Sequence, residues 1–92
     1  MANAFDGQQW NIDTAGVIIF EPVNVKSVEW QGTGLTAGTD ELIILDPVTG
    51  IALYRSKATG TTVVEYRLIE QWWYNGFEVD TLDGGELIVR LQ

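Results

Sequence analysis

Apolar and polar positions mostly alternate along this chain, which is typical of β-strands that bury one face. The apolar runs are rich in β-branched and aromatic residues, and turns containing glycine separate them about every 8–12 residues. The pattern predicts strands at 8–13, 17–20, 23–31, 41–45, 51–56, 61–67, 73–81 and 86–92. We therefore expect an all-β fold, a small antiparallel β-sandwich or barrel of about seven or eight short strands.

One of these strands contains a phase error. The pair Val23 and Val25 is out of step by one residue with the next apolar pair, Val28 and Trp30. A β-bulge between the pairs, near Lys26, would return both to the same face of a sheet. The alternative is a strand whose two halves face opposite sides.

Several connections are also predicted. The segment 46–50 has proline at its second position and glycine at its end, so it predicts the turn of a hairpin. The strand before it, 41–45, is continuously apolar and is expected to be buried on both faces. Residues 68–72 fit helical spacing as well as strand spacing, and Asn75-Gly76 predicts a bulge or a turn. The glycine-rich segment 32–40 is expected to be a flexible loop.

Composition limits the possible functions. The 92 residues allow one domain, 1–92, and 46% of them are hydrophobic. The 13 acids and 5 bases give a net charge of −8, which disfavours nucleic-acid binding. The absence of cysteine and histidine removes disulfides, thiol chemistry and the commonest general base. The N-terminus lacks the features of a signal peptide, and no run is apolar enough for a transmembrane helix, so no membrane partner is expected.

The remaining polar motifs favour structural roles. The acids Glu78, Asp80, Asp83 and Glu86 surround one turn, but their spacing matches no calcium loop, which favours a solvated loop. The segment 32–34 resembles part of a phosphate loop without its lysine. No serine has a histidine to activate it. The sequence therefore predicts no enzyme activity, no cofactor and no metal site.

Aromatic residues are the most unusual feature of the chain. Trp72 and Trp73 are adjacent, so in an extended strand they would face opposite sides, one towards the core and one towards solvent. An exposed ring there could belong to a protein interface or to a sugar-stacking site. The alternative is that both rings lie in the core or cover an open end of the sandwich. The residues predicted to contact a partner are Gly34, Leu35, Trp72, Trp73, Tyr74 and Phe77.

A resemblance extends over about the whole chain. It is carried by residues 10–18, by Pro22-Val23-x-Val25-Lys26-Ser27-Val28-x-Trp30, by Leu53-Tyr54-Arg55-Ser56-x-Ala58-x-Gly60, by Asn75-Gly76-Phe77-x-Val79-x-Thr81-Leu82 and by Gly85-x-Leu87-Ile88-Val89-x-Leu91. These segments resemble small virion-associated proteins of tailed bacteriophages. The matching residues are turn and core positions, and the run of three aromatics at 72–74 departs from the pattern.

The resemblance implies a structural virion protein present in many copies. We expect a capsid decoration or cement subunit that binds the major capsid protein or other virion proteins and stabilises the head. It implies a homo-oligomer, for example a trimer, located on the capsid surface after synthesis in the host cytoplasm. The alternative is a tail or fibre module that recognises a host-surface glycan or another virion protein.

Overall fold

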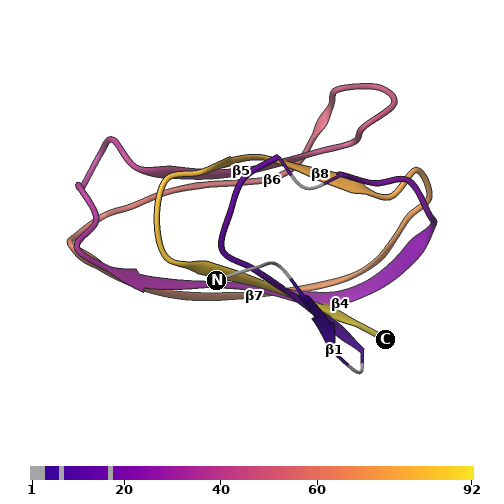
Figure 1. The fold of residues 1–92 in the computed structure, drawn as a ribbon, viewed down its shortest axis with the longest axis horizontal. Coiled ribbons are helices and arrows are strands. Elements are labelled where there is room, and N and C mark those ends of the chain that lie inside the picture. Colours follow the sequence, from indigo (N-terminus) through magenta and orange to yellow (C-terminus); the bar gives the residue numbers. More distant parts are fainter. Residues whose placement is uncertain (1–3, 7, 17) are drawn as a thin grey trace.

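The computed structural model describes residues 4–6, 8–16 and 18–92, and these form two antiparallel sheets packed face to face. One sheet has the order β1-β2-β9-β4-β7 and the other β3-β8-β5-β6. The strands are β1 (Ala4–Asp6), β2 (Gln9–Ile12), β3 (Ile18–Ile19), β4 (Val23–Thr33), β5 (Glu41–Leu45), β6 (Ala52–Lys57), β7 (Thr62–Trp73), β8 (Phe77–Leu82) and β9 (Glu86–Leu91). Figure 1 shows β5, β6 and β8 in one layer and β1, β4 and β7 in the other. The all-β fold class is confirmed as a sandwich, with one short strand, β1, that the sequence pattern did not predict.

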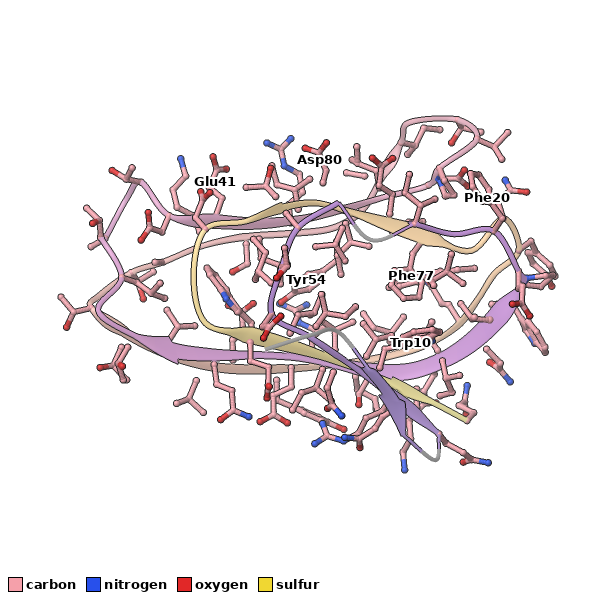
Figure 2. All side chains as sticks on the ribbon, viewed as in Figure 1. Trp10, Phe20, Glu41, Tyr54, Phe77 and Asp80 are labelled. Carbon is pink, nitrogen blue, oxygen red and sulfur yellow. The ribbon has the colours of Figure 1, made fainter. Side chains whose placement is uncertain are left out.

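The core lies between the two sheets. It is built from the alternate residues that each strand turns inward, and its largest fully buried side chains are Trp30 and Phe77. The ring of Phe77 points into the space between the layers in Figure 2. The indole Nε1 of Trp30 donates a hydrogen bond to the Gly84 carbonyl at 2.9 Å, so the one polar atom of this ring is satisfied. Burying such rings is the main stabilising term for a chain without disulfides.

The bulge predicted in β4 is confirmed. Val25 pairs with Leu91 of β9 and Ser27 pairs with Arg90, so Lys26 is an extra residue on β4. Both apolar pairs of β4 are consequently buried: Val23, Val25, Val28 and Trp30. On the other side of β4, two residues of β7, Ile69 and Glu70, lie opposite Lys26, so β7 is bulged at the same level.

The structure decides three further local predictions. The segment 68–72 belongs to β7, and the described residues contain no helix. A spacing of four residues also keeps side chains on one face of a strand, and Leu68 and Trp72 are both exposed on the outer side of β7. Glu70, between them, has a positive φ of 52° at the bulge opposite Lys26. The prediction that 41–45 is buried on both faces is wrong: Ile43 and Leu45 are only half-buried, because their side chains lie on the outer face of the sheet. Asn75-Gly76 forms the turn between β7 and β8.

This turn packs closely against the corner between β3 and β4. Gly76 has a φ of 82°, and a Cβ on it would lie 1.7 Å from the Ile19 carbonyl oxygen and 3.0 Å from that of Glu21. Only glycine tolerates both the backbone conformation and the contact. The turn therefore brings the residues after β7 next to Phe20, which lies between the two contacted carbonyls in the sequence.

Candidate interaction surface

The outward side of β7 is apolar, although this strand forms one edge of its sheet. Large hydrophobic side chains are exposed along it at Val64 (78%), Tyr66 (56%), Leu68 (51%) and Trp72 (50%). Their partners on β4 are outward polar residues, among them Glu29 opposite Tyr66. Scattered exposed apolar residues are ordinary, but a row of them along an edge strand marks an interaction surface. We call Val64, Tyr66 and Leu68 the β7 row.

The inward-facing residues that alternate with the β7 row are charged. Glu65 pairs with the buried Trp30, and Arg67 pairs with the buried Val28, so both side chains point towards the sandwich interior. At these two positions the strand reverses the usual arrangement, although Val63 on the same side is buried in the core. The reversal is tolerated because an edge strand lets inward charges reach solvent at the open side of the sandwich.

The two adjacent tryptophans face opposite sides, as predicted. Trp73 is 4% exposed and packs edge to face on Phe77, with ring centroids 5.8 Å apart. Trp72 is half-exposed and stacks on Tyr74 at a centroid distance of 6.0 Å. Tyr74 itself is 71% exposed. Together with Phe20, which is 68% exposed and lies at one end of the sandwich in Figure 2, these outward rings form what we call the aromatic end.

A groove lies beside the aromatic end. It has a volume of about 410 Å³ and is lined by Trp10, Ile19, Glu21, Pro22, Val23, Asn24, Trp72, Leu91 and Gln92. This is within the size range of small-ligand pockets, about 300–1,000 Å³, although the groove is open to solvent. Its walls come from β2, β4, β7 and β9 of one sheet, together with Ile19 of β3 in the other sheet and the connection between β3 and β4. The lining combines two indoles with aliphatic carbons and amides, which suits a protein segment or a sugar ring.

The structure separates the predicted contact residues into three groups. Trp72 and Tyr74 are exposed and adjoin each other at the aromatic end. Leu35, Trp73 and Phe77 are buried in the core, so in this fold their side chains contribute packing. Gly34 is exposed, but it is separated from the rings by the length of β7: the Leu35 N–H next to it bonds to the Thr61 carbonyl, before the start of that strand.

Sequence reasoning missed the β7 row and Phe20. The signal for the row was present as the alternation of Val64, Tyr66 and Leu68 with Glu65 and Arg67. Alternation identifies which residues share a face, but it does not say which face is inside. Only the register with β4, which sets Glu65 opposite Trp30, assigns the apolar side to solvent.

Hydrogen bonds connect the edge strands β6 and β7 across the flank of the sandwich. The Tyr54 hydroxyl donates to one carboxylate oxygen of Glu65, and the Ser56 hydroxyl donates to the other at 2.8 Å. Burial and the bond to the Glu65 carboxylate both raise the pKa of Tyr54 above its ordinary value. The two edge strands are therefore held together by a charge-assisted network.

The acidic side chains are the possible metal ligands in a chain without histidine or cysteine. No group of three or more acidic side chains within it could hold a metal ion. Of the four acids predicted to surround one turn, Asp80 and Asp83 are exposed, and Glu78 and Glu86 are half-buried. The Asp83 carboxylate accepts a bond from the Glu41 N–H at 3.0 Å, which is a structural role. Among the described residues no helix is long and apolar enough to cross a membrane.

The fold and its apolar surface are the available basis for a functional assignment. Comparison of the chain with models of protein families, with curated proteins and with solved structures found no match.

Proposed function

We propose that the chain is a structural subunit of a bacteriophage virion, a capsid decoration or cement protein that acts by binding and without turnover. The observation that carries the proposal is the aromatic end, where Phe20, Trp72 and Tyr74 expose large rings beside a groove. Aromatic anchors of this kind dominate the binding energy of protein interfaces. The resemblance to small virion proteins supplies the identity of the particle.

The partner is the major capsid protein or another virion protein with an apolar, basic contact face. The net charge of −8 favours a basic partner because complementary charge speeds association. The half-exposed Trp72 is already stacked on Tyr74, so binding would cost little ordering of either ring. A rigid pair of rings at the end of a sandwich is a preorganised contact.

Binding to particles tests the proposal directly. Virions grown without the gene would be mixed with purified chain and sedimented, and the bound chain would be quantified. We expect many copies per head for the natural sequence and a loss of most binding for Trp72→Ala/Tyr74→Ala. The matched control is Val48→Ala/Ile51→Ala, which removes two equally exposed apolar side chains, 67% and 66%, from the β5–β6 hairpin.

The outcomes separate clearly. Full binding by the Trp72→Ala/Tyr74→Ala variant, or virions that contain no copies of the natural chain, would overturn the proposal. Equal loss in the control variant would show non-specific apolar adhesion and would also count against it.

The groove favours one alternative, a tail or fibre module that binds a host-surface glycan. Trp72 forms part of its wall, and sugar rings stack on indoles. Titration with a glycan panel followed by tryptophan fluorescence distinguishes the two: a saturable change that Trp72→Ala abolishes supports the glycan. A handful of copies at one vertex of the particle would support it too.

A further inference from the structure

The uncovered edge of β7 can be assigned an occupant. β7 is the last strand of the five-stranded sheet, so on one side its backbone groups have no strand to pair with in the described chain. Such an edge invites another strand, and the apolar β7 row runs alongside it. We propose that two copies of this chain pair edge to edge through β7, antiparallel, about a two-fold axis at Tyr66.

The bulge limits which part of β7 can pair. A regular ladder needs regular strand geometry, and this ends where Glu70 takes its positive φ of 52°. At the other end, β7 begins at Thr62. The stretch that pairs regularly with β4, residues 62–68, contains Tyr66 and both neighbouring charged residues. A two-fold axis at Tyr66 pairs residues 64–68 of the two copies, all of which lie within this stretch.

The charges select the same register. With the axis at Tyr66, Glu65 of each copy lies opposite Arg67 of the other, and both side chains are on the inner face. An axis at Glu65 or at Arg67 would instead place like charges opposite each other. Opposite charges directly across a strand pair stabilise it, and like charges destabilise it.

The two charged groups are available for this contact. The Glu65 carboxylate is held in place by Tyr54 and Ser56, and it has about four acceptor sites, so two remain free. Arg67 is exposed, and it forms no ion pair with any residue that the structure describes. The strand therefore presents one fixed anion and one free cation, two residues apart, each complementary to the other in a second copy.

The apolar side chains are also matched in this register. Val64 of one copy lies opposite Leu68 of the other, and the two Tyr66 rings meet at the axis. These side chains are all on the outer face and all exposed in the single chain. Pairing covers them in the way that cross-strand partners cover one another within a sheet.

The dimer would sharpen the proposed function, on which this consequence rests. The axis is perpendicular to the sheet, so both copies of Trp72 face the same side, one at each end of the joined β7 strands. Six residues separate Tyr66 from Trp72, so the two aromatic ends would be roughly 40 Å apart at about 3.3 Å per residue. A two-headed subunit can connect two neighbouring capsid subunits, and two weak contacts then add.

Introduced cysteines test the register, because the chain has none of its own. In Tyr66→Cys the two copies place their sulfurs opposite each other, with Cα atoms about 4.5–5.5 Å apart, which a disulfide can span. In Val64→Cys the same residue of the two copies is four steps out of register, about 13 Å apart. We expect Tyr66→Cys to form covalent dimers at least about tenfold faster under mild oxidation, because pairing raises the effective concentration of the thiols. A mixture of Val64→Cys and Leu68→Cys chains should cross-link as heterodimers.

A charge exchange provides the second measurement. Arg67→Glu places four acids at the contact, and we expect it to raise the dissociation constant of the dimer about tenfold in sedimentation equilibrium. Glu65→Arg should do the same from the other side. Mixing the two variants restores both opposite-charge contacts and should restore dimerisation. Far-UV circular dichroism verifies that each variant is folded.

Two results would overturn the proposal. One is that Tyr66→Cys cross-links no faster than Val64→Cys. The other is a chain that stays monomeric in sedimentation, even if its β7 edge captures a strand from a different protein. Particle binding by the aromatic end is a separate readout. A monomer that still binds virions would refute only the proposed dimer. A dimer that binds no virions would refute only the proposed function.

Discussion

Each sheet ends in an edge strand on the same flank of the sandwich, β6 in one sheet and β7 in the other. The two edges differ in how they are protected against pairing with a strand of another molecule. β6 turns Arg55 and Lys57 to its outer face, which is the usual way in which proteins keep an edge from pairing. β7 is longer and turns Val64, Tyr66 and Leu68 outward. One chain thus protects one edge with charges and leaves the other edge apolar, which is the edge that we propose a second copy covers.

The largest effect should come from breaking the inward side of β7. Trp73→Ala removes a buried indole that packs on Phe77, and it should lower the free energy of unfolding by about 3–5 kcal/mol. Trp72→Ala, its matched control one residue away, removes a half-exposed ring and should cost about 1 kcal/mol or less. Urea denaturation followed by circular dichroism measures both. Equal losses would mean that the two faces of β7 are equally packed, contrary to the structure.

The turns that serve the two edges give the next contrast. Gly76, after β7, and Gly50, before β6, both have positive φ, 82° and 74°. Gly76→Ala also drives a Cβ into the Ile19 carbonyl, so the strain and the clash should together cost about 3 kcal/mol. At Gly50 an added Cβ has nothing within 4 Å, so Gly50→Ala should cost only about 1 kcal/mol. Thermal unfolding should therefore give a lower midpoint for Gly76→Ala than for Gly50→Ala. The opposite order would contradict the close contact that the structure shows at Gly76.

These contrasts show what the sequence can and cannot predict. The bulge at Lys26 followed from the phase of its neighbours, because only a shift of one residue buries both apolar pairs. The opposite faces of Trp72 and Trp73 followed from strand period alone. In β7 the same period was uninformative, since apolar Tyr66 and charged Glu65 alternate whichever side is inside. That choice depends on pairing with β4, a contact between segments far apart in the sequence.

The site was predictable to the same extent. Two exposed aromatics, Trp72 and Tyr74, could be identified from their run of rings, whereas Phe77 resembles them in sequence and is fully buried. Phe20 was missed because its exposure depends on the corner that Gly76 presses against. Exposure at a corner is set by tertiary packing, and no local pattern encodes it.

A smaller effect should come from breaking the link between the two edges. Tyr54→Phe removes the hydroxyl that donates to Glu65, and the partly exposed bond should be worth about 1 kcal/mol at pH 8. The folded state raises the pKa of Tyr54, so the unfolded chain ionises first, near pH 10. The hydrogen bond's contribution is therefore complete below about pH 10 and is lost as the pH rises through the folded pKa.

The measurement is the difference in unfolding free energy between the natural chain and Tyr54→Phe as a function of pH. We expect the difference to be constant from pH 7 to 9 and to shrink above pH 10. Ser56→Ala is the control, because it removes the other donor to Glu65 but no ionising group. A difference that grows with pH would contradict a raised pKa for Tyr54.

The smallest change in stability should come from giving β7 the protection that β6 already has. Val64→Lys/Leu68→Lys places two charges on the outer face, where the side chains they replace are 78% and 51% exposed. Because neither apolar group is buried in the single chain, the free energy of unfolding at low protein concentration should change by no more than about 0.5 kcal/mol. The association of the chain at high concentration should fall, since the lysines of one copy would then lie opposite those of the other. Stability lost without any change in association would mean that the row packs against its own chain, whereas association lost at constant stability assigns the row to a partner.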